Sequence, residues 1–258
     1  MKRMVSRVSG RGIRVACAVA GLSVLLAGSA TAQSTLFNIP STDAVEKGKG
    51  YFEIDWLAQA PGPETGARLF IYNPRFLAGV GHGIEVGVNI PIYHSSDFSD
   101  PSSLAYIQPN VKWKFLANDD LGLAASAGVV VNTPLNVRDG QSTWAYIYGN
   151  VSKKWKDGPR VTVGPYGVVA DQDSGKATFI GTKGGVLVGY EQPLSGKVSF
   201  VADWFSGKNS IGYFTPGISV TLPHSGLLNA GYSIGNDVGD ETANYKDRFL
   251  FLYYGVTF

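Results

Sequence analysis

The sequence is almost free of cysteine and holds no long apolar run beyond its first residues. Its single cysteine, Cys17, lies in a segment predicted to be removed, so the mature chain has no disulfide, thiolate metal site or cysteine nucleophile. No stretch of about 18 apolar residues remains after that segment, which excludes membrane-spanning helices. Charge is sparse too, at 16% of residues. A basic surface for nucleic acid is therefore excluded.

Residues 1–32 have the organisation of a secretory signal peptide. Lys2 and four arginines form the basic region, residues 15–27 form the apolar region, and Ala30-Thr31-Ala32 is a small-x-small cleavage site. The apolar region is shorter than the roughly 20 residues that span a bilayer. Cleavage removes five of the 22 basic residues and none of the 20 acidic ones, which leaves 17 against 20 and a net charge of −3. We predict an exported mature chain that starts at Gln33.

Residues 33–50 form a polar segment without a strand pattern. Asp43, followed three residues later by Glu46, could cap one helical turn that ends at Gly48. We expect a short periplasmic N-terminal segment here, and a plug for the lumen is the alternative.

From residue 51 to residue 258 the chain alternates apolar and polar residues in segments of about ten, the pattern of transmembrane β-strands. Turn-forming residues interrupt the pattern, and short breaks alternate with longer, more acidic ones. Six hairpins follow, so the sequence predicts an all-β, antiparallel transmembrane β-barrel of 12 strands. The short breaks are 81–83, 117–120, 156–159, 192–196 and 223–226; the others are 59–67, 94–103, 132–142, 171–177, 207–210 and 236–246.

The last strand predicts which side chains meet lipid. An aromatic-rich strand at a chain end is expected to pair with the first strand and close the barrel, because termini otherwise fray. Aromatic residues near strand ends favour this barrel over a secreted soluble barrel or sandwich. The membrane-closing strand directs Leu250, Leu252, Tyr254, Val256 and Phe258 to lipid, and Phe251, Tyr253, Gly255 and Thr257 to the lumen.

The expected location is the outer membrane of a Gram-negative bacterium. The expected partners are outer-membrane lipid and lipopolysaccharide, the barrel-assembly machinery acting through the C-terminal strand, and small solutes, with no nucleic acid.

The same alternation places charged and aromatic side chains in the lumen. Opposed acidic and basic walls would select passing solutes; alternatively, salt-bridged side chains fill a narrow interior and conduct little. Inward aromatic rings would favour aromatic or apolar solutes, which stack on them. The predicted lumen charges are Glu53, Asp55, Glu85, Lys112, Lys114, Lys154, Lys183 and Asp203, and the predicted lumen aromatics are Tyr51, Tyr72, Tyr93, Tyr106, Tyr148, Tyr166, Phe249, Phe251 and Tyr253.

One pattern points to an enzyme instead. His94 and Ser96 share the lipid-facing side at the expected outer rim, where they could act as base and nucleophile on lipid esters. This is similar to outer-membrane phospholipases, which are also twelve-stranded, but no orienting asparagine can be assigned. The acidic loops at 171–175 and 237–241 lack a full set of calcium ligands. No catalytic residue, metal or cofactor is predicted.

The sequence also resembles a family of outer-membrane barrels named for the meta-cleavage pathway of phenol degradation. The resemblance rests on NPRFLAG at 73–79, GIEVGVNIP at 83–91, QPNVKWK at 108–114, GYE at 189–191 and TPGI at 215–218. It implies a transport-like barrel for small aromatic or apolar compounds. We therefore expect a passive channel or uptake barrel; a lipid hydrolase and a closed structural or adhesive barrel are the alternatives.

Overall fold

The computed structural model describes residues 34–60, 68–96, 103–136, 142–170, 179–236 and 248–258. All of them belong to one compact unit, Thr31–Phe258. The predicted signal peptide and both acidic loops, 171–175 and 237–241, lie outside the described residues. Among the residues described, no helix is long and apolar enough to cross a membrane.

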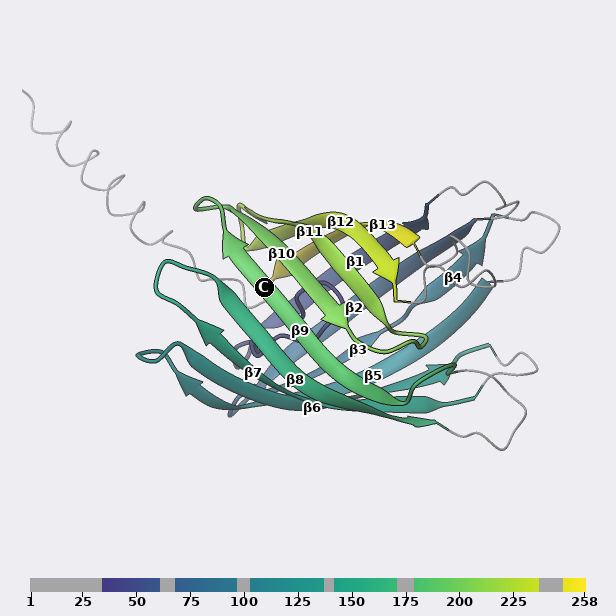
Figure 1. Cartoon of the computed structure of the whole chain (residues 1–258), viewed down its shortest axis with the longest axis horizontal. Coiled ribbons are helices and arrows are strands. Elements are labelled where there is room, and N and C mark those ends of the chain that lie inside the picture. Colours follow the sequence, from purple (N-terminus) through teal and green to yellow (C-terminus); the bar gives the residue numbers. More distant parts are fainter. Residues whose placement is uncertain (1–33, 61–67, 97–102, 137–141, 171–178, 237–247) are drawn as a thin grey trace, which may run out of the picture. The chain divides into compact units, whose positions relative to one another are not determined.

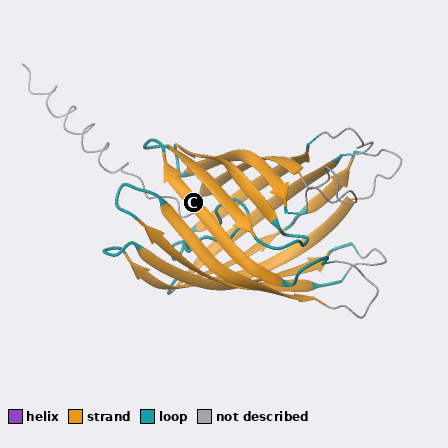
Figure 2. Cartoon of the chain, in the orientation of Figure 1, coloured by secondary structure: helices purple, strands orange, loops and turns teal. Residues whose placement is uncertain are grey.

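The described residues form one antiparallel sheet that curls into a barrel (Figures 1 and 2). Its strands are β1 (Gly50–Gln59), β2 (Leu69–Gly81), β3 (Ile84–Asn89), β4 (Ile92–Ser95), β5 (Ser103–Asn118), β6 (Leu123–Pro134), β7 (Trp144–Lys154), β8 (Arg160–Ala170), β9 (Gly184–Pro193), β10 (Val198–Phe205), β11 (Tyr213–Leu222), β12 (Gly226–Gly235) and β13 (Arg248–Thr257).

The twelve-strand prediction is confirmed, because β3 and β4 are two parts of one span. Both pair with β2 on one side and β5 on the other, and they are separated at Ile90 and Pro91. Proline cannot donate to a ladder, but the Pro91 carbonyl still accepts a hydrogen bond from the Tyr106 amide (3.0 Å). The last strand closes the ring: β13 pairs with β1 from Tyr51↔Thr257 to Gln59↔Phe249. The barrel therefore has no free edge among its described strands.

Short turns gather at one end of the barrel and longer connections at the other, as the alternating breaks predict. The tightest turn joins β2 to β3, where His82 and its two neighbouring glycines have positive φ angles of 53°, 104° and 73°. A Cβ on Gly83 would lie 2.2 Å from the Lys114 carbonyl oxygen, so glycine is required there. The barrel strands begin at Gly50 and end at Thr257 on this short-turn end.

The outer wall is apolar. Leu250, Leu252 and Tyr254 are exposed on β13 and Phe258 is exposed just after it, as the closing-strand pattern predicts, and Val256 is half-buried. Apolar side chains on the other strands continue the surface around the barrel. They include Trp56, Phe76, Trp113, Phe115, Ile147, Val163, Val186, Trp204, Phe214 and Ile218. Such a band is the surface that a barrel presents to lipid.

Inside the barrel lies the chain that precedes β1, which we call the N-terminal segment (residues 34–49). Its tip folds back on itself through a hydrogen bond from the Leu36 amide to the Ile39 carbonyl (2.9 Å). Its side chains contact inward-facing residues of the strands, so it lies in the lumen rather than leading in from outside. Residues 43–46 carry no helical turn; a turn between Glu46 and Lys49 precedes β1 instead.

Candidate functional site

Asp203 on β10 holds the tip of the N-terminal segment. One carboxylate oxygen accepts hydrogen bonds from the backbone amides of Phe37 (2.9 Å), Asn38 (2.6 Å) and Ile39 (3.0 Å). Three consecutive amides on one carboxylate form a small anion-binding nest. Asp203 is 1% exposed, so these donors take the place of the water that would otherwise solvate its carboxylate.

Two lumen glycines leave room for the apolar side chains of the tip. A Cβ on Gly189 would lie 2.5 Å from Leu36, and a Cβ on Gly217 would lie 2.9 Å from Phe37. Leu36, Phe37 and Ile39 pack into a buried cluster with aromatic and aliphatic side chains from β7 to β13. One side of the interior is therefore a hydrophobic core that the segment completes.

A buried ion pair on the barrel wall anchors the segment at Ser34 and at Val45. Lys112 Nζ lies 3.4 Å from Glu85 Oε1, and both side chains are almost fully buried. Lys112 also donates to the Ser34 carbonyl (2.9 Å), while Glu85 accepts from the Ser34 hydroxyl and from the Val45 amide (2.8 Å). The pair is satisfied only with the segment in place, which ties the barrel wall to the segment.

Further contacts run along the segment toward the short-turn end. Asn150 donates to the Pro40 carbonyl (2.5 Å), and the Thr42 and Ser152 hydroxyls lie 2.6 Å apart. At the mouth, Asp43 pairs with Arg160. Burial alone would raise the pKa of the Asp43 carboxyl, but Arg160, Lys114 and Lys112 favour its charged form and hold this pKa below its ordinary value.

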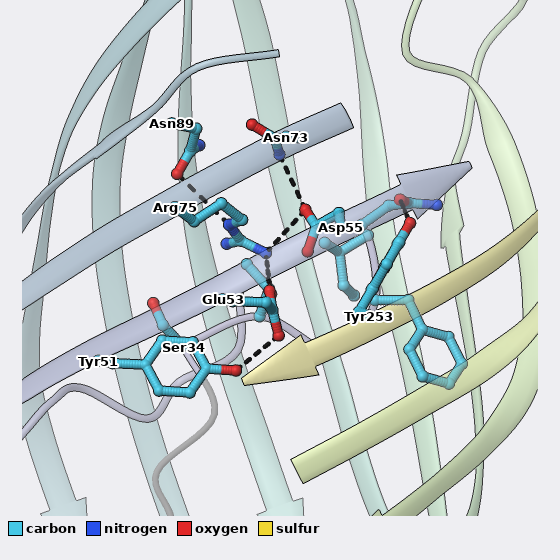
Figure 3. Close-up of polar contacts among 12 residues, drawn as sticks. Ser34, Tyr51, Glu53, Asp55, Asn73, Arg75, Asn89 and Tyr253 are labelled. Carbon is cyan, nitrogen blue, oxygen red and sulfur yellow. Dashed lines mark hydrogen bonds and ion pairs between the residues drawn. The ribbon is translucent and has the colours of Figure 1, made fainter. Parts of the chain in front are cut away.

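A second ion-pair network lies on β1 and β2, beside the closure of β1 with β13 (Figure 3). Arg75 Nη1 lies 2.6 Å from Glu53 Oε1 and 3.9 Å from Asp55 Oδ2. The Tyr51 hydroxyl donates to Glu53 (2.5 Å), and Asn73 donates to Asp55 (2.8 Å). All of these side chains come from β1 and β2, whose register sets Glu53 directly opposite Arg75. Arg75 also donates to Thr35 (3.0 Å), which links this network to the segment.

Residues of the N-terminal segment line two cavities that have no lining residue in common. The long-loop cavity, of about 790 Å³, has Thr35, Phe37 and Asn38 in its lining. The short-turn cavity, of about 970 Å³, includes Thr42 and Asp43. In this arrangement the segment lies between the two ends of the barrel.

The long-loop cavity has two unlike walls. Side-chain amides on β3, β5 and β6 form one: Asn89 donates to Gln108 (3.3 Å), and Gln108 donates to Asn132 (2.8 Å). Besides Tyr93 and Tyr106 on the amide side, aromatic rings form a wall that begins at Trp144, the cross-strand partner of Asn132. They come from β7, β10, β11 and β13 and are Trp144, Tyr146, Phe205, Tyr213 and Phe249.

The structure places the sequence-predicted charges in three settings. Glu53, Asp55, Glu85, Lys112 and Asp203 are buried inside the barrel. Lys114 lies 3.8 Å from Asp43. Lys154 is exposed in the lining of the short-turn cavity, and Lys183 donates to the Ala170 carbonyl (2.9 Å) at the edge of β8.

Of the predicted lumen aromatics, all but one lie inside. Tyr51, Tyr106, Tyr148, Tyr166, Phe249, Phe251 and Tyr253 are buried, and Tyr93 packs edge-on against Tyr106 in the long-loop cavity. Tyr72 differs: it is 43% exposed on the outer wall, opposite Trp56. Arg75 and Leu77 point inward, and side chains alternate along a strand. The even-numbered residues of this part of β2, Tyr72 among them, therefore point outward.

Sequence reasoning missed three charged residues of the interior: Arg75, Arg160 and Glu191. Arg75 joins the β1 network, and Arg160 pairs with both Asp43 and Glu191. The signal was present, because Arg75 alternates with outward Phe76 and Arg160 shares its side with buried Thr162. Alternation therefore assigns the inward side, but it does not pair the charges.

The His94 and Ser96 pair of the hydrolase alternative is not joined by a hydrogen bond among the described residues. His94 Nδ1 lies 3.1 Å from the Ser103 hydroxyl on β5, and the Ser96 hydroxyl accepts from the Arg68 amide (2.7 Å). Both residues contribute to the hydrogen bonding at the long-loop rim.

Comparison with known proteins identifies the fold. No family model and no curated protein matches the sequence. An outer membrane channel from Pseudomonas putida F1 is similar in structure, with a TM-score of 0.57 and 12% identity over 83% of this chain and 97% of that one. The chain therefore has the twelve-stranded fold of outer-membrane barrels.

Two further structures are less similar. Outer membrane phospholipase A from Escherichia coli has a TM-score of 0.46 at 12% identity, over 82% of this chain and 97% of that one. The toluene transporter of Ralstonia pickettii has a TM-score of 0.40 at 8% identity, over 83% of this chain and 89% of that one. At these TM-scores neither likeness bears on function.

Proposed function

We propose that the protein is a passive channel or uptake barrel of the bacterial outer membrane for small solutes, including aromatic or apolar ones that stack on rings. The observation that carries the proposal is the lumen with a cavity at each end and the N-terminal segment between them. The fold shared with an outer membrane channel supports it. The short-turn end, where the barrel strands begin and end, would face the periplasm.

The manner of closure supports a path that opens by movement of the segment. Its hold on the wall consists of hydrogen bonds, ion pairs and one apolar tip, without a covalent link, because the mature chain has no cysteine. We expect removal of the whole segment to join the two cavities. We expect the barrel to conduct weakly with the segment in place and more strongly without it.

The test is single-channel conductance of the refolded mature protein in planar bilayers. A variant lacking residues 34–46 is expected to show a larger and steadier conductance than the complete mature chain, since Gly50 and its pairing with β13 are retained. Heat-modifiable migration on SDS gels checks that both proteins are folded.

Silent channels from a folded deletion variant, together with no solute uptake into vesicles, would contradict the channel proposal. That result would favour the closed structural barrel, whose support is the filled interior: salt-bridged side chains and the hydrophobic cluster around Leu36 occupy its middle.

A further inference from the structure

We infer that the long-loop cavity is a binding site for neutral, polyhydroxylated ring compounds of monosaccharide to disaccharide size. The inference rests on the proposed function and names the class of solute that would enter. The observations that support it are the amide and aromatic walls of the cavity, its low net charge and its volume.

The amide wall has hydrogen-bonding capacity to spare. A primary amide has two N–H donors and one carbonyl acceptor. Asn89 and Gln108 each give one N–H to the next side chain in the row, so each retains a second N–H. The Asn132 amide nitrogen donates to none of the described residues, and all three side chains line the cavity. The wall therefore offers three donors beside partly used carbonyl acceptors, which suits hydroxyl groups that both donate and accept.

The spacing of this wall fits several hydroxyl groups rather than one. The three amides stand on neighbouring strands, which lie about 4.8 Å apart. A compound with a single hydroxyl would engage one member of the row. A ring that carries hydroxyls around its edge would engage two or three at once.

The aromatic wall, which adjoins the amides where Trp144 pairs with Asn132, fits the apolar face of a ring. Tyr146 contacts both Trp144 and Phe205, with ring centroids 6.3 Å and 5.9 Å apart. Such a surface stacks against flat apolar faces. The C–H face of a sugar ring and an aromatic ring both meet this requirement, and an aromatic ring with one hydroxyl or none would leave most of the amide wall unused.

The cavity carries little net charge. Asp55 and Arg75 are its buried charged side chains, and they lie 3.9 Å apart in the β1–β2 network. Arg68 is exposed at the rim. A charged ligand would find no unpaired counter-charge at depth, and the cost of dehydrating it would not be recovered. The volume of about 790 Å³ leaves space for a disaccharide with water around it.

Intrinsic fluorescence provides a direct test, because Trp144 is the one buried tryptophan of the five. Trp56, Trp113 and Trp204 are exposed on the outer wall, and Trp155 is exposed beside the short-turn cavity. The refolded mature protein in detergent micelles is titrated with glucose, a neutral disaccharide, phenol and gluconate. We expect the two neutral sugars to change the fluorescence and gluconate to leave it unchanged. Trp144→Phe should remove the change.

Two amide variants on β5 form a matched pair. Gln108→Met removes the central amide and should weaken sugar binding about three- to tenfold, the effect of one neutral hydrogen bond. Asn110→Leu changes an amide on the same strand that does not line the cavity, and it should leave sugar binding unchanged.

Phenol binding more tightly than both sugars would overturn the inference in favour of an aromatic ligand. Equal affinity of the wild type and Gln108→Met, or no response to either sugar, would overturn it as well. Because binding is measured in micelles, a barrel that binds sugar but does not conduct would contradict only the channel proposal.

Discussion

The hydroxyl oxygens of Thr42 and Ser152 lie 2.6 Å apart, which brings the N-terminal segment against the inner face of β7. Hydroxyl oxygens at hydrogen-bonding distance place the two β-carbons within reach of a disulfide. Residues 33–258 contain no cysteine, so a pair introduced here can form only one intramolecular bridge within that range.

A Thr42→Cys/Ser152→Cys variant should therefore lock the segment in the lumen. Under oxidising conditions we expect lower conductance than in the wild type, and addition of a reductant should restore it. Each single-cysteine variant serves as the control and should not respond to the reductant. A bridged protein that conducts as well as its reduced form would show that the segment does not close the path.

Loss of the Asp203 carboxylate should loosen the tip of the segment. Asp203→Ala removes the acceptor of three backbone amides, and we expect conductance to rise and the segment to be cleaved faster by added protease. Asp203→Asn keeps one carbonyl acceptor and should have a smaller effect. Identical behaviour of the two variants would argue against this anchor.

Filling the space beneath the tip should release it by a different route. A side chain at Gly189 would overlap Leu36 and Ile39, so Gly189→Val is expected to raise conductance in a folded barrel. Gly167→Val on β8 is the control, because nothing lies within 4 Å of a Cβ there. Equal conductance of the two variants would contradict the packing argument.

Arg75 should be the most costly single charge to remove from the interior. Arg75→Met leaves Glu53 and Asp55 buried without their cation, and breaking such a pair costs about 3–5 kcal/mol of unfolding free energy. Urea unfolding of the vesicle-refolded protein measures this loss, and adding Glu53→Gln should recover part of it. Arg68→Met, at the exposed rim, should change stability by no more than about 0.5 kcal/mol.

The pH dependence of closure should follow Asp43. Its pKa is lower in the folded protein than in the unfolded chain, so its contribution is complete above the unfolded value and is lost as the pH falls through the folded value. We expect conductance to be constant at neutral pH and to rise below about pH 4. Asp43→Asn should already show the raised conductance at pH 7 and a flatter acid response.

The hydrolase alternative has a separate test. We expect no release of fatty acid from phospholipid vesicles by the refolded protein, and no difference between the wild type and His94→Ala. Hydrolysis that His94→Ala abolishes would establish the enzyme. The hydrogen bonds of His94 with Ser103 and of Ser96 with the Arg68 amide provide a structural role for both residues.

Much of the architecture could be predicted from the order of residues. The side-chain period of a strand is two, so apolar residues at 250, 252, 254 and 258 had to share a face with lipid. Turn chemistry separated the hairpins and gave their number. The prediction for Tyr72 was wrong because β2 begins just after residues 61–67. No unbroken alternation therefore connected Tyr72 to a strand whose lipid-facing side was already assigned.

What the sequence by itself determined is the barrel: twelve strands, their inward and outward sides, and the closing strand. These follow from local periodicity, which is visible within about ten residues. The tertiary structure alone decided that residues 34–49 occupy the lumen, that Arg75 pairs with Glu53, and that Asp203 receives the amides of the tip. Those contacts join residues from 22 to 166 positions apart. The register of β1 with β2 brings Arg75 to Glu53, and the curvature of the closed sheet brings Asp203 to the tip.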